Sequence, residues 1–330
     1  MHPKAVVVTH RALVHNIAQL LCVMAPISSE SCEVSWLPQY HDMGLIGAAL
    51  VRLGVLGGRA VLFDPLLFLR TPLSWPIAMS QFGATHTGGP DFAYGLIARR
   101  EMERRRGRRG GTGAAEGPAA PPYDLSRLHF ALIGGERVRE STMRTLVETF
   151  GDSGLRPDAL CPSYGLAESC VYVSHERGLV VDRGAGERDR DGDGDGDDAY
   201  VMVPPGAPSE GASGPHEPRC ALSVGQPVPG FGVEIVIARI DAQGEVVRGE
   251  AGAVRLASDG GVGEIWVRSS SCTPGYWDQY RRGRGGGGAV ADATSSGYLH
   301  EGGARFLRTG GAFTRARRAR RVPTAVFREG

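Results

Sequence analysis

Short apolar runs alternate with segments of helical periodicity over the first half of the chain. Residues 5–9 are a β-branched run that predicts a short buried strand, and residues 10–22 have helical spacing behind Thr9, which can cap a helix. Further strands are expected at 34–37, 60–63, 85–87 and 128–133, and helices at 43–53, 72–81, 91–100 and 141–150. Short strands separated by helices predict an α/β fold with a mostly parallel sheet flanked by helices.

The pattern changes after about residue 221. Short β-prone runs punctuated by glycine follow one another at 233–240, 244–247, 253–256 and 263–267. This spacing predicts antiparallel strands, which we expect to form a smaller, distorted β-barrel subdomain. The expected organisation is an α/β subdomain at 1–181, a disordered acidic and glycine-rich linker at 182–218, a β subdomain at 219–313 and an unstructured basic tail at 314–330.

Two polar stretches interrupt this organisation. Residues 99–122 are rich in arginine and glycine, and we expect an inserted, solvated loop there. The triple arginine at 104–106 could instead be a nucleic-acid patch, but no aromatic residue is interleaved for base stacking, which favours the loop. Residues 189–198 repeat aspartate as calcium loops do, but lack the glutamate that closes such a loop, which favours a disordered linker.

Charge, hydropathy and cysteine usage narrow the class of protein. Lys+Arg 37 against Asp+Glu 36 gives a net charge of +1, so no overall field favours nucleic acid or an anionic membrane. The longest apolar stretch, 44–51, is too short to span a bilayer, and no apolar segment follows the charged start. The sequence contains six cysteines and no C-x-x-C pair, which suits a reducing compartment. These features predict a soluble, cytoplasmic protein.

Four segments bounded by glycine or proline carry the candidate chemistry. They are W-L-P-Q-Y-H-D-M-G-L at 36–45, G-G-P-D-F-A-Y at 88–94, I-G-G-E at 133–136 and C-P-S-Y-G-L-A-E at 161–168. In open α/β sheets, ligands bind at loops that leave the carboxyl ends of the strands, and glycine lets a ligand approach the backbone closely. The sequence therefore predicts a ligand site built from these loops.

In order and wording the four segments resemble the adenylate-forming superfamily, the AMP-dependent synthetases and ligases, and within it the fatty acyl-AMP ligases most. The resemblance covers about residues 3–173 and, more weakly, 223–310. It implies that a fatty acid and ATP give acyl-AMP and pyrophosphate, and that the acyl group then passes to the phosphopantetheine thiol of an acyl carrier protein. The alternative acceptor is coenzyme A, as in acyl-CoA ligases.

The resemblance also implies how a nucleotide and its metal ion would be bound. Tyr164 would stack its ring on adenine. Glu168 would hold Mg²⁺, which neutralises charge on the phosphates as pyrophosphate leaves. The other nucleotide-binding positions that the resemblance implies are Gly134, Gly135, Glu136, Gly165, Leu166 and Ala167.

Catalytic and acyl-binding roles follow from the same resemblance. His41 would sit beside the carboxylate under attack. Thr9 and Lys4 match the tail of the family's phosphate-binding loop, with Lys4 as a point charge near the phosphates. The positions that would wall the acyl channel are Gly89, Phe92 and Tyr94.

Each of these residues also has a structural interpretation when it is taken alone. A tyrosine before glycine commonly packs its ring, and a glutamate at a helix start is commonly a surface charge. His41 and Asp42 could form a structural hydrogen-bonded pair. The segments at 223–230, 263–268 and 274–277 resemble the family's β subdomain and are expected mostly to pack strands and turns. It is the joint order of the motifs that favours a nucleotide site around Tyr164 and Glu168.

The sequence departs from the family pattern in ways that bear on activity. Gly311 stands where the family has an aspartate that binds both ribose hydroxyls. Each such hydrogen bond to a charged carboxylate contributes about 1.5–3 kcal/mol, so weaker nucleotide binding is expected. We expect catalytic parts of the family, the start of the phosphate loop and the C-terminal domain with its lysine, to be missing at the two ends and the chain to be inactive alone. A non-catalytic binding module that keeps the fold is the alternative from another class.

Overall fold

The computed structural model describes residues 5–54, 58–109, 123–178, 180–182, 199–202, 221–222, 224–241, 245–249, 253–257, 262–277, 298–301, 304–316 and 320–321. Lys4, most of the predicted linker at 182–218, the second half of the predicted insert and the end of the predicted basic tail lie outside these residues. None of the helices in the described part of the chain is long and apolar enough to cross a membrane.

Strands and helices alternate through the first half of the chain. In order they are α1 (His10–Val23), β1 (Cys32–Ser35), the π-helical segment η1 (Met43–Leu50), α2 (Val51–Leu53), β2 (Arg59–Leu62), α3 (Pro65–Arg70), α4 (Ser74–Phe82), β3 (His86–Gly89), α5 (Asp91–Arg109), β4 (Phe130–Ile133), α6 (Glu140–Phe150), β5 (Leu160–Tyr164) and β6 (Ser174–His175). Short 3-10 turns lie at Gly151–Ser153, Pro157–Ala159 and Ala167–Ser169, the last labelled η4.

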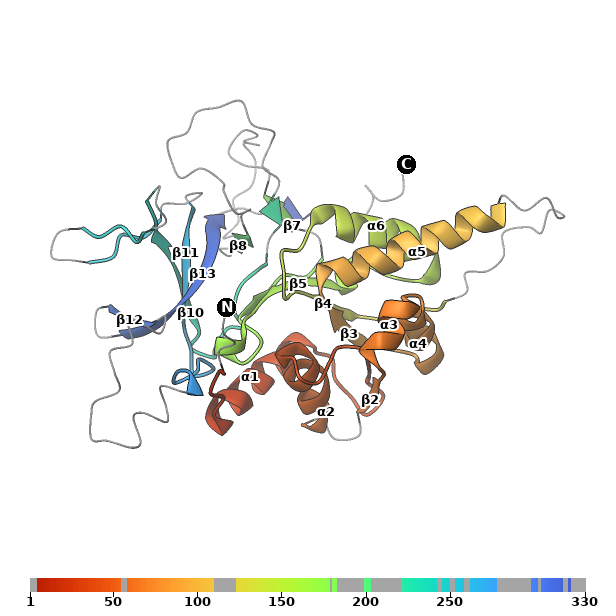
Figure 1. The fold of residues 1–330 in the computed structure, drawn as a ribbon, viewed down its shortest axis with the longest axis horizontal. Helices are drawn as coiled ribbons and strands as arrows, with labels where there is room; N and C mark the ends of the chain where they lie inside the picture. The colour runs from red at the N-terminus through yellow and green to blue at the C-terminus, as the bar shows by residue number, and fades with distance from the viewer. Residues whose placement is uncertain are drawn as a thin grey trace, which may run out of the picture. The chain divides into compact units, whose positions relative to one another are not determined.

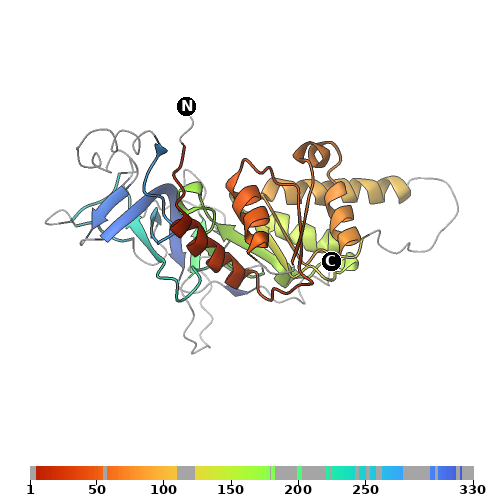
Figure 2. The same ribbon diagram turned by 90° about the horizontal axis from the view of Figure 1, so that it is seen from below.

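These strands form one six-stranded sheet in the order β2-β1-β3-β4-β5-β6. The pairs from β2 through β5 run parallel, so the strands point their carboxyl ends to the same edge. Helices α5 and α6 lie side by side on one face of the sheet (Figures 1 and 2), and α4 packs beside α5, since the ring of Trp75 lies 4.8 Å from that of Tyr94. The predicted α/β class, with a mostly parallel sheet flanked by helices, is confirmed.

The second half of the chain forms antiparallel sheets. The strands of the larger one are β8 (Ala199–Met202), β10 (Glu234–Arg239), β11 (Val262–Arg268), β12 (Tyr298–Glu301) and β13 (Ala304–Ala316). Their order is β10-β11-β13-β12, with β8 on β13, and the described strands do not close into a ring, so the predicted barrel is not confirmed. A three-stranded sheet joins β14 (Arg320–Arg321), β7 (Val180–Asp182) and β9 (Ala221–Leu222).

The chain divides into two compact units that are interleaved along the sequence. Unit 1 consists of Met1–Gln19, Tyr164–His175 and Val181–Arg320, and unit 2 consists of Leu20–Ser163, Glu176–Val180 and Arg321–Gly330. The first residues of the chain and the loop after β5 therefore group with the antiparallel strands, whereas the sequence pattern places both in the α/β subdomain.

Two local expectations need correction. Residues 5–9 do not enter the parallel sheet; Val6 forms an antiparallel bridge with Tyr276, and Val8 is 42% exposed. The β-branched run favours extended backbone, but its partner lies far along the sequence, where no local pattern could identify it. At the other end, the tail expected to be unstructured from residue 314 still contains the end of β13 and the short β14.

The arginine-rich stretch after residue 99 begins as helix rather than as a loop, because α5 continues to Arg109. The carboxylate of Glu101 is fully buried and accepts hydrogen bonds from Arg104 at 2.7 Å, from Arg105 at 2.8 Å and from the hydroxyl of Tyr123 at 2.9 Å. Pairs three and four residues apart stabilise a helix, so these arginines extend α5 instead of forming a solvated insert.

Thr9 caps α1 as predicted, since its hydroxyl accepts a hydrogen bond from the backbone N–H of Ala12 at 3.1 Å.

A buried histidine at the start of β3 predicts sensitivity of unit 2 to acid. His86 is fully buried, its Nε2 lies 2.8 Å from the carbonyl oxygen of Met24, and its Nδ1 lies 2.7 Å from the hydroxyl of Thr85. Burial, aided by the nearby charge of Arg52, lowers the pKa of His86 from 6.5 to about 3. Between these pH values His86 binds a proton in the unfolded chain but not in the folded chain. The contribution of His86 to stability is therefore lost as the pH falls from 6.5 to 3.

We therefore expect the free energy of unfolding to fall more steeply between pH 6.5 and pH 4 in the unsubstituted chain than in His86→Gln. Urea unfolding at several pH values measures the difference. His10→Gln, at an exposed position, is the matched control and should behave like the unsubstituted chain. Equal slopes for His86→Gln and the unsubstituted chain would contradict the prediction.

Candidate functional site

Three of the four predicted loops meet at the carboxyl edge of the parallel sheet in unit 2. The backbone N–H of Phe92, in the first turn of α5, donates to Oε1 of Glu136 at 2.7 Å, which joins the loop after β3 to the loop after β4. A Cβ built on Gly135 would lie 3.1 Å from Sδ of Met43, so the loop after β4 also touches the segment that follows β1. Glu136 thus places its charge at the amino end of α5, where a helix dipole favours it.

The motif after β5 begins beside the motif after β4. Pro162 is opposite Ile133 in the parallel register, and a Cβ on Gly134 would lie 3.1 Å from the carbonyl oxygen of Ser163. A side chain at position 134 would be tight against the end of β5, which favours glycine there.

His41 lies at the surface in the turn before η1. Its Nδ1 is 2.7 Å from Oδ1 of Asp42, and 55% of its side chain is exposed. Asp42 also accepts the N–H of Met43 at 2.7 Å and so caps η1. The structure thus brings the side chains of His41 and Asp42 into contact, as the structural alternative expected, and the imidazole remains accessible to solvent; its catalytic role stays a prediction.

The three predicted acyl-wall residues differ in environment. Gly89 is buried, and a Cβ there would lie 2.9 Å from Cη2 of Trp75, so only glycine fits. Tyr94 is 3% exposed, and its hydroxyl donates to the carbonyl oxygen of Leu132 at 3.0 Å. Burial raises the pKa of Tyr94 well above 10, so the hydroxyl remains a donor. Phe92 is 47% exposed and meets Trp36 edge to face.

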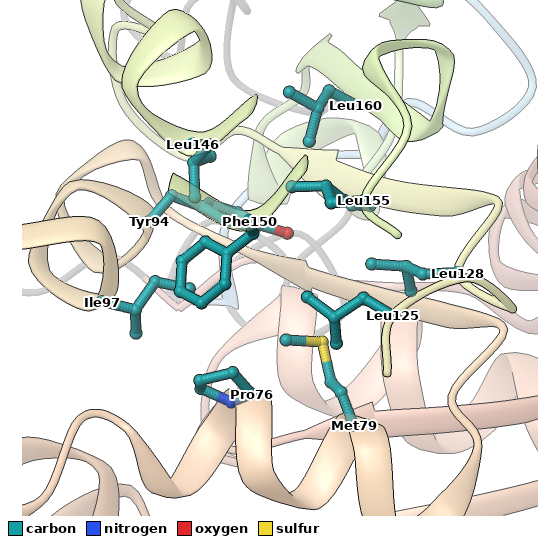
Figure 3. Close-up of a pocket in the computed structure, with 11 residues that line it drawn as sticks. Pro76, Met79, Tyr94, Ile97, Leu125, Leu128, Leu146, Phe150, Leu155 and Leu160 are labelled. Carbon is teal, nitrogen blue, oxygen red and sulfur yellow. The ribbon is translucent and has the colours of Figure 1, made fainter. Parts of the chain in front are cut away.

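An apolar hollow of about 280 Å³, including space open to solvent, lies beneath the sheet between α4, α5 and α6 (Figure 3). Met79, Tyr94 and Phe150 face it, together with Leu128 and Leu160 near the amino ends of β4 and β5. Because the four loops leave the opposite ends of these strands, the hollow is not the meeting point of the motifs. Of the predicted acyl-wall residues, it has Tyr94 alone in its lining.

Tyr164 ends β5 and belongs to unit 1. Its ring is half-buried against a cluster of apolar side chains of the β subdomain that includes Val173, Ile237 and Ile265, and Leu166 packs on the same cluster. Burial raises the pKa of Tyr164 to about 12, a hydrogen bond with Thr309 opposes this rise, and the charge of Glu168 adds to it. The ring is therefore held by packing against this cluster, and the charge of Glu168 acts on its hydroxyl.

The loop after Tyr164 is tightly constrained. A Cβ on Gly165 would lie 1.7 Å from the carbonyl oxygen of Val171, and the N–H of Val171 bonds to the carbonyl oxygen of Ser169 at 2.9 Å. Cys170, between them, has φ 65 and ψ −72, a γ-turn conformation that costs a non-glycine residue about 1–3 kcal/mol. Strain of this kind is common at functional sites, and here it lies two residues after Glu168.

Glu168 sits in the 3-10 turn η4 (Ala167–Ser169) with its side chain half-buried. Its Oε1 accepts a hydrogen bond from the hydroxyl of Tyr276 at 2.7 Å, and its backbone oxygen accepts the N–H of Thr273 at 2.7 Å. The sequence analysis did not identify Tyr276 or Thr273 as site residues. The only local signal was the turn sequence P-G-Y-W, which predicts packing rather than contact with a carboxylate.

A metal ion at Glu168 fits the chemistry of the described residues. No group of three or more His, Cys, Asp or Glu side chains in the described part of the chain could hold a metal by itself. Mg²⁺ is commonly bound by one or two protein carboxylates together with substrate phosphates, so a single accessible glutamate suits Mg²⁺ delivered with a nucleotide. Among the described residues, no side chain hydrogen-bonds to Oε2 of Glu168.

Comparison with known proteins assigns the class. The sequence model of the family described as AMP-binding enzyme matches residues 2–277, most of this chain, and the chain belongs to that family. Its relatives within the family are fatty acid AMP and CoA ligases.

Two relatives and one solved structure illustrate the similarity. The chain is 28% identical to the medium-chain fatty acid–acyl-carrier-protein ligase JamA of Moorena producens, over 96% of this chain and 47% of JamA. It is 31% identical to the long-chain fatty acid–AMP ligase FadD26 of Mycobacterium bovis, over 84% of this chain and 41% of FadD26.

The structure resembles a fatty acyl-adenylate ligase of L. pneumophila that was solved in complex with acyl adenylate and pyrophosphate. The TM-score is 0.62 at 28% identity, over 94% of this chain and 48% of that one. The chain thus spans less than half the length of each of these three proteins.

Proposed function

We propose that this chain is the core of an ATP-dependent fatty acid adenylating enzyme, which joins a fatty acid to AMP and releases pyrophosphate. The observation that carries the proposal is the family match over residues 2–277 combined with the placement of the four motif loops at strand ends. The relatives named for fatty acid ligation support a fatty acid as the substrate class.

The chain's own residues would bind the nucleotide and orient it. Tyr164 would offer one ring face to adenine while the other packs on the β subdomain. Glu168 would hold Mg²⁺, which supplies neutralisation of phosphate charge when it is bound. His41, exposed in the turn before η1, would contact the fatty acid carboxylate, and the backbone of Gly134 to Glu136 would border the base.

For the acyl acceptor we propose the phosphopantetheine thiol of an acyl carrier protein; the name of JamA gives an acyl carrier protein for that relative. Coenzyme A is the alternative. Product analysis with each thiol, supplied separately with preformed acyl-AMP, separates the two acceptors.

Binding of a non-hydrolysable acyl-adenylate analogue tests the role of Tyr164. Because stacking of a base on an aromatic ring contributes about 1–3 kcal/mol, Tyr164→Leu should weaken binding about tenfold or more in calorimetry, whereas Tyr164→Phe should bind nearly as the unsubstituted chain does. Tyr40→Leu is the matched control, because Tyr40 is 91% exposed. Equal affinities for Tyr164→Leu and the unsubstituted chain would reject the adenine-stacking role.

Gly311 favours a second candidate, a non-catalytic module that binds adenylates without forming them. Gly311 lies within β13, where it offers no carboxylate for ribose hydroxyls. Fatty acid-dependent exchange of pyrophosphate into ATP separates the two candidates, since only the enzyme catalyses it. We propose that exchange by this chain is weak because Gly311 offers no carboxylate, and that Gly311→Asp tightens ATP binding; no exchange in either chain would favour the binding module.

A further inference from the structure

The segment from Thr273 to Trp277 holds Glu168 at two points. The Tyr276 hydroxyl donates to Oε1, and the Thr273 N–H donates to the Glu168 backbone oxygen, each at 2.7 Å. These contacts fix both the carboxylate and the peptide of a residue 108 positions earlier in the chain. Of the contacts between the β subdomain and the η4 turn that the structure describes, this is the one that reaches the carboxylate.

The same segment is attached on its other side to the first residues of the chain. The N–H of Val7 donates to the carbonyl oxygen of Gly275 at 3.1 Å, and the Thr273 hydroxyl donates to the carbonyl oxygen of Val7 at 2.6 Å. The N–H of Trp277 donates to the carbonyl oxygen of Ala5 at 2.8 Å. Tyr276 therefore lies in a segment that is held by strand-like backbone hydrogen bonds to the first residues of the chain.

The Tyr276–Glu168 bond restricts how the carboxylate presents itself. A tyrosine hydroxyl has one proton to donate, and an ionised carboxylate can only accept it. A tyrosine hydroxyl keeps its proton at neutral pH, so Tyr276 stays the donor in this bond. Because Oε1 already accepts this bond, Oε2 is the carboxylate oxygen that accepts no side-chain hydrogen bond from the described residues.

We propose that Tyr276 is a positioning residue that holds Oε1 of Glu168 and so directs Oε2 toward a nucleotide-bound divalent cation. This inference rests on the proposed function, because it takes Mg²⁺ and ATP as the ligands of Glu168. Tyr276 acts through Glu168 and does not itself touch the nucleotide.

The test titrates Mg²⁺ into the purified chain with ATP and follows ATP binding by calorimetry. Because Tyr276→Phe removes the hydrogen bond that orients the carboxylate, it should raise the half-saturating Mg²⁺ concentration about tenfold and leave ATP binding in EDTA unchanged. Tyr123→Phe is the matched control, because the Tyr123 hydroxyl also donates to a glutamate, Glu101, at 2.9 Å but lies in unit 2. This control should leave the Mg²⁺ dependence unchanged.

A double-substitution cycle separates positioning from general damage. If Tyr276 acts through Glu168, Tyr276→Phe should have little further effect on the Mg²⁺ dependence in a Glu168→Gln chain. Tyr276→Phe retains the ring, and thermal melting checks that the fold is intact. An unchanged Mg²⁺ dependence in Tyr276→Phe, beside an altered one in Glu168→Gln, would overturn the inference alone. No Mg²⁺-dependent ATP binding in the unsubstituted chain would overturn both the inference and the proposed role of Glu168.

Discussion

Gly165→Ala is expected to lower the free energy of unfolding by about 3 kcal/mol or more, at the upper end of the cost of overpacking. The added Cβ would lie 1.7 Å from the carbonyl oxygen of Val171 and 2.8 Å from its carbonyl carbon. Both are backbone atoms, and the backbone there is anchored because the N–H of Val173 donates to the carbonyl oxygen of Tyr164 at 3.0 Å. No side-chain rotation can relieve the clash, so the loop between Tyr164 and Glu168 has to open.

Urea unfolding measures this loss, and binding of the acyl-adenylate analogue measures its effect on the site. Gly151→Ala is the matched control, because a Cβ at Gly151 meets nothing within 4 Å and its φ of −56 suits any residue. We expect the control to change stability by less than about 1 kcal/mol, in the stabilising direction. A Gly165→Ala chain as stable as the Gly151→Ala chain would show that the loop is not held as closely as the structure has it.

Glu33→Gln is expected to cost about 3–5 kcal/mol at pH 8, because it removes one partner of a buried ion pair. Nη2 of Arg52 lies 3.2 Å from Oε2 of Glu33, and the two side chains are only 3% and 4% exposed. Nε and Nη1 of Arg52 are buried without a hydrogen-bond partner among the described residues, so Glu33 is the one carboxylate that compensates this charge. An uncompensated buried guanidinium would remain.

The same pair predicts a dependence on pH. Burial raises the pKa of Glu33 from 4.5 to about 7, although the charge of Arg52 opposes the rise. Between these values the folded chain keeps a proton that the unfolded chain releases, so this contribution to stability is present below pH 4.5 and is lost as the pH rises through 7. The unsubstituted chain therefore gains stability between pH 8 and pH 6, whereas Glu33→Gln lacks this titration, so Glu33→Gln should cost more at pH 6 than at pH 8.

Two controls isolate the charge. Replacing both partners, as Glu33→Leu with Arg52→Met, should restore most of the stability, because apolar side chains can substitute for a buried pair. Glu103→Gln removes an exposed partner of Arg100, where both side chains are about half exposed, and should cost less than about 1 kcal/mol. If Glu33→Gln cost no more than Glu103→Gln at pH 8, the pair would not be desolvated as described.

The sequence pattern predicted correctly those features that depend on residues close together in the chain. The alternation of β-prone and helical segments predicted the parallel sheet, because burial on both faces requires apolar runs whatever the partner strand. Thr9 was predicted as a cap because a helix start needs an acceptor one turn away, and Thr9 provides it. The loops after β1, β3 and β4 were identified by their residues, and their contacts through Glu136 and Met43 follow from parallel strands ending at one edge.

The predictions that failed depended on distant partners. Residues 5–9 look like a sheet strand, yet their partner is the segment at Tyr276. Arg104 and Arg105 look like part of a solvated charge run, yet both donate hydrogen bonds to the buried carboxylate of Glu101 within α5. In both cases the residue type was compatible with either outcome, and only the packed environment selected one.

The sequence by itself determined the α/β class, the order of its elements and the residues that form the motif loops, because these follow from side-chain size, polarity and spacing along the backbone. The tertiary structure alone decided that Tyr276 holds Glu168, that Arg52 is buried against Glu33, and that Gly165 has no room for a methyl group. Those three facts depend on which atoms lie next to one another after folding, and no spacing along the chain encodes a distance of that kind.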